Sequence, residues 1–382
     1  MKNKPNIVLL IILIMFPQFV ETIYSPALPN IAQAFQVSKQ QASLTLSFYF
    51  IAFAFGVIFW GILSDIIGRR SAMLCGLFTY AIGAVSALLT RDFNMILIAR
   101  VVAAFGASVG SIITQTILRD VYRKEDLGYV FSIIGVSLSL SPVIGFITGG
   151  YVARFFGYQG VFMVVLLVAV LLLINAIIFL PETRSPIKQD RPKIGVVLRQ
   201  LLSDRLIWLS ALLVALFNIM LFSYYSLAPF IFEQSGYNTT QFGYSGILLA
   251  IGSLAGGLLN KRLIRLNFST HRLIYISSVM SIIGAVGIFI LQGSLWFLFP
   301  MFFILIAFSI AIPNILSQAL IKYKDVVGTA GALFGLLYYI LIGLGLTASG
   351  WIQDFGLVLI ISSLLAILFA RVYKKYTLIF NL

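Results

Sequence analysis

The chain has 382 residues, of which 60% are hydrophobic and only 10% are charged. A soluble protein of this length carries roughly 25% charged residues. Apolar segments of about 20 residues, the length that crosses a bilayer core of about 30 Å, recur along the whole sequence. This composition excludes a soluble globular fold, which would leave too much apolar surface in water, and predicts an all-α membrane protein with many crossings.

The distribution of the net charge of +14 predicts the orientation of the chain. Of the 26 Lys and Arg residues, 22 fall on one side of the predicted membrane, and only Lys39, Arg91 and Arg154 fall on the other, with Arg100 inside a span. This is the positive-inside pattern, and it puts both termini in the cytoplasm. We therefore expect a multi-pass protein of a bacterial inner membrane whose partners are the lipid bilayer and small molecules, with no nucleic-acid partner.

Twelve spans fit the hydropathy pattern. Their predicted ranges are 7–28, 42–62, 72–90, 94–115, 128–151, 160–180, 206–227, 241–260, 272–291, 295–313, 327–348 and 354–372. The first begins after Lys2 and Lys4 and lacks a small-residue cleavage site, so we interpret it as an uncleaved span. The proline- and charge-rich segment 181–205 predicts a cytoplasmic linker between two six-helix bundles, 1–180 and 206–382.

The two predicted bundles repeat each other, as transporter halves often do. Residues spaced by 196 match in the pairs Gly56/Gly252, Gly61/Gly257, Leu63/Leu259 and Arg69/Arg265, and residues spaced by 200 match in Gly128/Gly328, Gly135/Gly335, Gly145/Gly345 and Gly150/Gly350. Asp65 is replaced by Lys261 and Pro142 by Ile342, so these two residues distinguish the first half from the second. We predict two pseudo-symmetric bundles.

The first predicted span contains Glu21, followed by Tyr24-Ser25-Pro26-Ala27-Leu28-Pro29. An ionisable residue in a span costs about 2.5–3.5 kcal/mol on insertion scales and therefore needs a reason. The run from Tyr24 resembles the D-x-Y-x-P-A-L-P segment of Bcr/CflA-type drug exporters. The resemblance puts the acid of that family on Thr22, whereas the acid here is one residue earlier, a rotation of about 100° on a helix.

The loop between the second and third spans carries Gly61, Leu63, Asp65, Gly68, Arg69 and Arg70. It resembles the G-x-L-a-D-r-x-G-r-k signature of the major facilitator superfamily, with Ile66 as the departure. We expect Asp65 to pair with a basic residue or to meet a helix N-terminus, and Arg69 and Arg70 to bind carboxylates or anionic lipid. Such contacts would close the cytoplasmic side in one state; the alternative is a simple topology anchor.

The fourth predicted span contains Arg100, which resembles the helix-4 arginine that the superfamily uses in proton transfer, although Ala103 replaces the usual glutamine. Helical rise puts Glu21 and Arg100 at a similar depth, each about 21 Å from the cytoplasmic edge. We predict that they share one cavity or pair with each other. Glu21 is then a site where a proton and a cationic substrate compete; the alternative is a purely structural ion pair.

The fifth predicted span contains Pro142, Gly145, Gly149 and Gly150 and resembles the antiporter signature g-x8-G-x3-G-P-x2-G-G, with Phe146 in place of the last glycine. Pro142 removes a helix hydrogen bond and bends the span, and the glycines allow close helix contact. Generic packing is the alternative interpretation. The resemblance implies export by antiport.

Polar and aromatic residues in the spans are candidates for a substrate cavity. Tyr24, Asn218 and Tyr338 are the ones we select, and Tyr49 belongs to the same set. Tyr224 and Tyr225 lie near a span end, where we expect them in the aromatic belt at the membrane interface.

Together these features predict a major facilitator fold that works as a proton-coupled antiporter and exports small molecules of the drug or multidrug type. Export of an endogenous metabolite such as a siderophore or amino-acid product, and uptake by proton symport, remain alternatives. One His, one Cys and no phosphate-binding loop argue against an enzyme or an ATP-driven pump. We expect no cofactor, no metal and a monomer.

Overall fold

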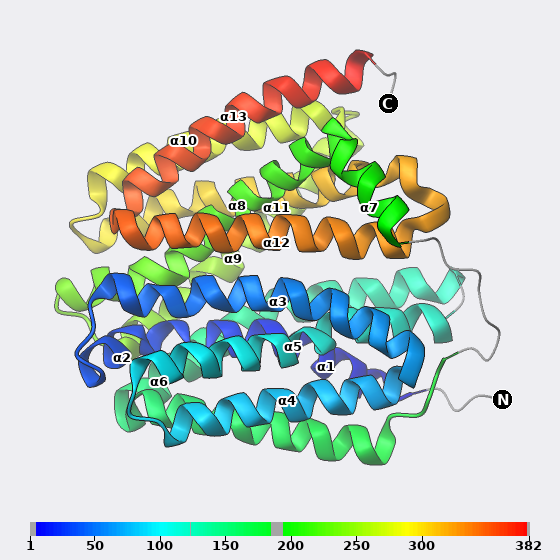
Figure 1. Cartoon of the computed structure of the whole chain (residues 1–382). Coiled ribbons are helices and arrows are strands. Elements are labelled where there is room, and N and C mark those ends of the chain that lie inside the picture. Colours follow the sequence, from blue (N-terminus) through cyan, green and yellow to red (C-terminus); the bar gives the residue numbers. More distant parts are fainter. Residues whose placement is uncertain (1–4, 123, 185–193, 380–382) are drawn as a thin grey trace. The chain divides into compact units, whose positions relative to one another are not determined.

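A computed structural model describes residues 5–122, 124–184 and 194–379. Lys2, Lys4 and residues 185–193 of the predicted linker lie outside the described residues. The chain forms two compact units, the first from Met1–Arg191 with Thr239–Tyr244 and the second from Pro192–Asn238 with Ser245–Leu382. Every regular element of the described residues is helical (Figure 1).

The first unit contains the helices that carry the charged motifs. They are α1 (Ile7–Thr22), the 3-10 helix η1 (Ser25–Ala27), α2 (Leu28–Ala34), α3 (Lys39–Ile67), α4 (Arg69–Leu89), α5 (Phe93–Val121) and α6 (Lys124–Phe179). The helix α5 packs against α1, α3 and α4, and α6 packs against α1 and α4. Side-chain caps fix two starts: Ser38 and Gln41 form a capping box before α3, and Asp92 accepts from the Asn94 N–H before α5.

The second unit repeats this all-helical plan. Its elements are α7 (Ile194–Ser203), α8 (Arg205–Gln234), α9 (Thr239–Arg265), α10 (Thr270–Leu291), η2 (Leu295–Phe297), α11 (Leu298–Ala319), η3 (Ile321–Val326), α12 (Val327–Ile352) and α13 (Phe355–Ile379). Helix α8 packs against α11, α12 and α13, and α10 packs against α11 and α13.

The prediction of twelve crossings is confirmed. Eleven helical stretches among the described residues are long and apolar enough to span a membrane. One of them, Ile133–Phe179, has 47 residues and as one straight helix would be about 70 Å long, more than twice a bilayer core. Gly157 interrupts it with φ 62° and ψ −165°, a conformation that favours glycine. This stretch therefore holds two crossings.

The structure adds two details to the predicted spans. The first span runs over Ile7–Ala34, but its α-helix ends at Thr22, η1 follows, and an α-helix resumes at Leu28; Pro26 and Pro29 lack the N–H groups that a continuous helix needs there. The predicted loop at 152–159 is also absent, since the helix continues on both sides of Gly157 and the chain turns at that glycine.

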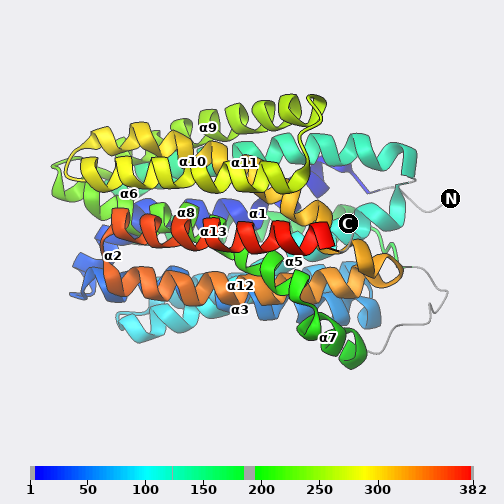
Figure 2. The same ribbon diagram turned by 90° about the horizontal axis from the view of Figure 1, so that it is seen from above.

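The predicted linker contains a helix that the hydropathy pattern did not indicate. Val197 and Leu201 of α7 are buried, and α7 packs against α12 and α8 (Figure 2). The Trp208 Nε1–H donates to the Leu202 carbonyl over 2.9 Å, which satisfies a group at the end of α7.

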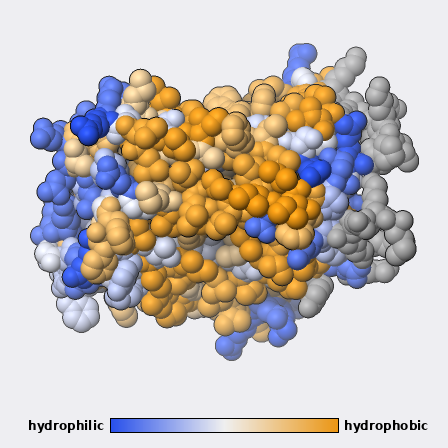
Figure 3. Space-filling view, turned by 90° about the horizontal axis from the view of Figure 1, so that it is seen from below, coloured by the Kyte–Doolittle hydropathy of each residue, from blue (hydrophilic) through white to orange (hydrophobic). Residues whose placement is uncertain are grey.

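The surface fits a lipid environment. On the face seen in Figure 3, hydrophobic residues predominate between hydrophilic residues gathered at either end. Large apolar side chains are strongly exposed, for example Leu89 at 80% and Ile290 at 72%. In water such an extended apolar surface would be an aggregation hazard, so it is the part that contacts acyl chains.

Candidate functional site

Glu21 and Arg100 are the only acidic or basic side chains that are buried among the described residues, at 7% and 2% exposed. Glu21 lies in the last turn of α1, immediately before the proline-induced interruption, and Arg100 lies in α5, which packs against α1. Arg100 is near enough to act electrostatically on Glu21. No hydrogen bond or ion pair between described residues joins the two side chains, so the direct pairing is not seen in this conformation, and a shared cavity stays a prediction.

Two tyrosine rings hold the Arg100 guanidinium. Its Cζ lies 3.9 Å from the centre of the Tyr24 ring and 4.4 Å from that of Tyr49. A desolvated cation–π contact contributes about 2 kcal/mol, so these rings partly offset the burial of the charge. Tyr24 comes from the interruption after α1 and Tyr49 from α3, where its hydroxyl donates to the Pro17 carbonyl. Tyr24 therefore contributes to this cluster through its ring face.

Several polar atoms of the cluster lack partners. Glu21 Oε1, Arg100 Nε and Arg100 Nη2 are buried without a hydrogen bond among the described residues. Leaving a buried donor or acceptor unpaired costs about 1–3 kcal/mol, and more for a charged group. Such atoms are able to bind a proton, an ion or a polar ligand group, and this cluster is therefore the candidate site for coupling and substrate.

The glycines of the antiporter-like segment bring α6 close to α1. A Cβ at Gly145 would collide with the Thr22 side chain, and a Cβ at Gly149 would collide with the Ile23 carbonyl. Thr22 itself is fully buried, and its hydroxyl donates to the Gln18 carbonyl over 2.8 Å. Position 22 thus faces α6, whereas the side chain at position 21 lies near enough to Arg100 to be influenced electrostatically.

The same helix makes further contacts on either side of its proline. Next to Pro142, which lies inside α6, the Ser141 hydroxyl donates to the Met15 carbonyl of α1 over 3.2 Å. The Gly150 carbonyl accepts from the Thr239 hydroxyl over 2.9 Å, and a Cβ at Gly150 would collide with Thr239 and Gly243. The first turns of α9, Thr239–Tyr244, belong to the first unit. The glycines of α6 therefore allow close packing against α1 and against these turns of α9.

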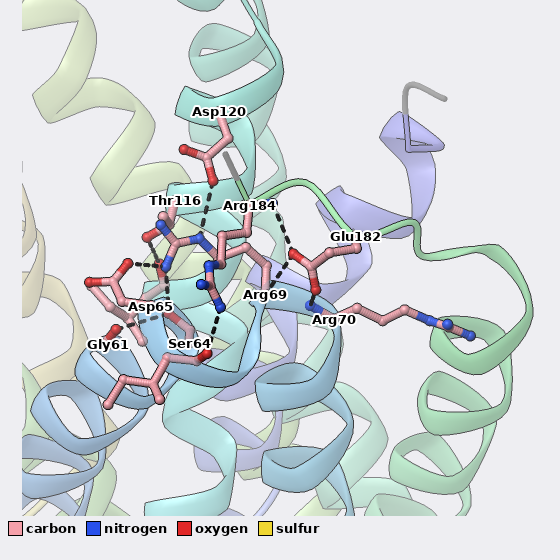
Figure 4. A network of polar contacts seen from close by, with 11 residues as sticks. Gly61, Ser64, Asp65, Arg69, Arg70, Thr116, Asp120, Glu182 and Arg184 are labelled. Atoms are coloured by element: carbon pink, nitrogen blue, oxygen red, sulfur yellow. Dashed lines mark hydrogen bonds and ion pairs between the residues drawn. The ribbon is translucent and has the colours of Figure 1, made fainter. Parts of the chain in front are cut away.

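A charged network closes the turn between α3 and α4 (Figure 4). Arg69 forms an ion pair with Asp65 and another, of 3.1 Å, with Asp120 at the end of α5. Its Nη1 also donates to the Ser64 hydroxyl over 2.8 Å. The predicted partner of Asp65 is therefore Arg69 in this conformation, and Asp120 is a member that the sequence did not reveal. The network ties together the ends of three helices.

Glu182 and Arg184 were also missed, and they bind the two helix ends at this turn. The Glu182 carboxylate accepts from the Arg69 N–H over 2.9 Å and the Arg70 N–H over 3.1 Å, both at the start of α4. The Arg184 guanidinium donates to the Ile66 carbonyl at the end of α3. An anion thus meets a helix N-terminus and a cation meets a helix C-terminus, as the helix dipoles favour. We call Glu182 and Arg184 the helix-end clasp.

The backbone donors also act on the protonation of Glu182. Burial alone would raise its pKa, but the N–H groups of Arg184, Arg69 and Arg70 outweigh burial and lower the pKa below its ordinary value of 4.5. The carboxylate is therefore ionised at neutral pH. The sequence predicted that a linker begins at residue 181, but nothing local to Glu182 indicated a contact more than 110 residues away.

The remaining predicted residues have simpler surroundings. Arg70 Nη2 donates to the Ile177 carbonyl of α6 over 2.6 Å. A Cβ at Gly61 would meet only Ile112, at an ordinary 3.6 Å. The Asn218 amide donates to the Val214 carbonyl of its own helix, and the half-buried Tyr338 ring contacts Tyr339 at 4.6 Å between centroids. None of these contacts marks or excludes a substrate cavity.

The expected position of Tyr224 and Tyr225 in an interfacial belt was wrong. Both are buried, and the Tyr224 hydroxyl donates to the Ser245 hydroxyl over 2.6 Å. The reason is that Tyr224 packs into an aromatic cluster with Phe297 and Phe355, and a helix of 30 residues carries these positions well inside α8.

Twelve apolar crossings in two helical units, with two buried opposite charges, are the features of a polytopic membrane transporter. A family model described as Major Facilitator Superfamily matches residues 10–346. The chain belongs to the major facilitator superfamily, which assigns it to the secondary transporters and not to the enzymes. The family resemblance seen in the loop after the second span is thereby confirmed.

Similar proteins include both unassigned transporters and resistance proteins. An "Uncharacterized transporter" from Rickettsia felis is 33% identical over 88% of this chain and 87% of its own length. A "Bicyclomycin resistance protein homolog" from Haemophilus influenzae is 28% identical over 66% of this chain and 65% of its own length. A "Chloramphenicol resistance protein" from Pseudomonas aeruginosa is 27% identical over 84% of this chain and 77% of its own length.

Solved structures support the fold. A partially occluded, inward-open structure of the xylose transporter XylE from E. coli superposes with a TM-score of 0.76, covering 97% of this chain and 96% of that one at 13% identity. At this identity the likeness establishes the major facilitator fold alone.

Proposed function

We propose that the protein exports small molecules from the cytoplasm in exchange for protons, with Glu21 as the group for which proton and substrate compete. The observation that carries the proposal is the buried, unpaired carboxylate oxygen of Glu21 beside the buried Arg100. A buried carboxylate without a partner is stabilised either by a proton or by a cationic ligand group. Exchange of one for the other links the two transport steps.

Export as the direction of transport is supported by the resistance proteins among the relatives and by the antiporter-like segment from Pro142 to Gly150. The positive-inside distribution supports a cytoplasmic location of both termini in a bacterial inner membrane. In the cycle, protonation of Glu21 from outside releases substrate, and deprotonation inside allows substrate to bind again. Alternating exposure of this site to the two sides of the membrane completes the exchange.

The charged network at the α3–α4 turn has a separate role in the proposal. Asp65, Arg69 and Asp120 join the ends of three helices, and the clasp residues join the same turn to the end of α6. We assign this network to the stabilisation of one conformational state at the predicted cytoplasmic end. It would form and break once in each cycle, which makes it a determinant of turnover and not of affinity.

Inside-out vesicles with a respiration-generated proton gradient test the proposal. Added substrate should partly collapse the gradient in vesicles that contain the wild type. The Glu21→Gln variant should be inserted normally and should not respond. The exposed Glu233→Gln change is the matched control and should respond like the wild type, because this side chain lies outside the buried cluster. A gradient collapse in Glu21→Gln vesicles as large as that of the wild type would show that another group couples the proton.

A further inference from the structure

We infer that the substrate is a zwitterion, whose carboxylate binds Arg100 and whose cationic group binds Glu21. This inference rests on the proposed function, because it assigns a chemical class of substrate to the same site. It differs from the sequence-based expectation of a cationic substrate, which takes account of Glu21 alone.

The unpaired atoms of Arg100 form a fork. Nε and Nη2 lie on one edge of the planar guanidinium, so their N–H bonds point in the same direction. This edge matches the two oxygens of a carboxylate, which accept two parallel hydrogen bonds. Both nitrogens are buried and have no partner among the described residues, in a side chain that is only 2% exposed. A carboxylate fills both positions at once, whereas a single carbonyl oxygen fills one.

Two aromatic rings lie against the guanidinium, with the centres of Tyr24 and Tyr49 at 3.9 Å and 4.4 Å from Cζ. The edge that carries Nε and Nη2 has no partner among the described residues, so a ligand reaches Arg100 through that edge. The same two rings would otherwise be the natural partners of a lipophilic cation. A cation without an anionic group is repelled by Arg100 and leaves the fork unfilled, which makes it a poor match for this cluster.

Glu21 supplies the second half of the match. Its Oε1 is buried and unpaired, and the carboxylate does not form an ion pair with Arg100 among the described residues. The two opposite charges are therefore held near each other but apart, an arrangement that accepts a ligand carrying both charges. A proton competes with the substrate ammonium for Glu21, while the carboxylate on Arg100 distinguishes substrate from a simple cation.

Matched probes on two scaffolds test the inference. The first set is norfloxacin, its ethyl ester and its N-acetyl derivative, which are zwitterion, cation and anion; the second is phenylalanine with its methyl ester and N-acetyl derivative. Binding to the purified full-length chain in nanodiscs is measured by equilibrium dialysis. On at least one scaffold the zwitterion should bind at least about tenfold more tightly than either derivative. Each derivative lacks one charge-assisted contact, and the loss of such a contact weakens binding by about this factor.

The Arg100→Lys variant retains the charge and removes the fork. It should bind the zwitterion at least about tenfold more weakly and the ester with unchanged affinity, which also shows that it is folded. The exposed Arg91→Lys change is the matched control and should bind every probe like the wild type. If Arg100→Lys does not fold, the comparison of probes on the wild type still tests whether the site prefers a zwitterion.

The outcomes separate this inference from the proposed function. Three outcomes would overturn the inference: equal binding of zwitterion and ester, failure of both zwitterions to bind, or unchanged zwitterion binding by a folded Arg100→Lys variant. In each case, gradient collapse by any compound would still support the proposed antiport. Zwitterion binding that depends on Arg100, with no gradient collapse by any bound probe, would support the inference and contradict the proposed antiport.

Discussion

Gly68 adopts φ 100° and ψ 158°, between the end of α3 and the start of α4. This region of backbone conformation is almost restricted to glycine. A Cβ at this position would also collide with the Glu182 carboxylate. The residue therefore permits both the sharp turn and the close approach of the clasp. Gly61, the other glycine of the same motif, has an ordinary backbone conformation and room for a methyl group.

The two glycines make a matched pair of substitutions. Gly68→Ala should lower the stability of the protein by about 1–3 kcal/mol, the cost of forcing a side chain into this backbone region, and should displace Glu182. Gly61→Ala should have little effect. Apparent melting temperatures of the two purified variants check this, and equal melting temperatures would contradict the turn geometry.

Asp65 has a role that binding and turnover measurements can separate. Asp65→Asn removes one ion pair of Arg69 and leaves the Asp120 contact in place. We expect slower turnover with little loss of substrate binding, because the network is proposed to stabilise one conformational state and does not touch Glu21 or Arg100. The exposed Asp126→Asn change at the same predicted end is the control. Unchanged turnover by Asp65→Asn would reduce the loop to a topology anchor.

The helix-end clasp connects elements that are far apart in the sequence. Glu182 binds the N-terminus of α4, Arg184 binds the C-terminus of α3, and Arg70 binds a carbonyl in the last turn of α6. Each contact pairs a charge with the helix end that its sign favours. The segment that follows α6 therefore fixes the same turn that the Asp65–Arg69 pair spans.

The lowered pKa of Glu182 gives the clasp a pH dependence. A carboxyl whose pKa is lower in the folded state stabilises that state above its unfolded pKa, and the contribution is lost as the pH falls through the folded value. The difference in melting temperature between wild type and Glu182→Gln should therefore be largest at neutral pH and should shrink below about pH 4.5. A difference that is constant from neutral to acidic pH would mean that the charge of Glu182 is not responsible.

Much of the helical plan follows from the sequence because it depends on local properties. Long apolar segments predict the crossings, and the glycine spacing predicts two similar bundles. The interruption after Thr22 also has a local cause, since Pro26 and Pro29 lack backbone donors. The two prolines do not show, however, that a short α-helix resumes at Leu28. The packing of α7 depends on tertiary contacts, which hydropathy does not encode.

The candidate site likewise contains residues that the sequence identifies and contacts that it does not reveal. Glu21 and Arg100 are identifiable from the sequence because a charge within an apolar span is conspicuous, and Tyr24 by its place in the family-like segment. The contacts of Arg100 with the Tyr24 and Tyr49 rings, and the hydrogen bonds of Glu182 to the α4 N-terminus, are not identifiable from the sequence. Those contacts join residues many positions apart, and tyrosines and acidic loop residues have many other possible roles.

At the scale of the whole molecule, corresponding helix ends of the two units are linked by different chemistry. In the first unit, charged residues link the ends of α3, α4 and α5. In the second, α9 and α11 are linked by the neutral pair Asn260 and Asn314, whose amide groups are 2.8 Å apart. The buried charges at Glu21 and Arg100 also belong to the first unit. We therefore assign coupling to the first unit, which also contains the charged network at the α3–α4 turn.

The most direct test of Glu21 as the coupling group is proton release on substrate binding. The purified chain is placed in weakly buffered solution near neutral pH, and a compound that collapsed the gradient in vesicles is added while the pH is recorded. The wild type should release protons as the substrate displaces them, and Glu21→Gln should bind the compound without releasing any. Equal release by both proteins, or binding to the wild type with no release, would contradict the assignment.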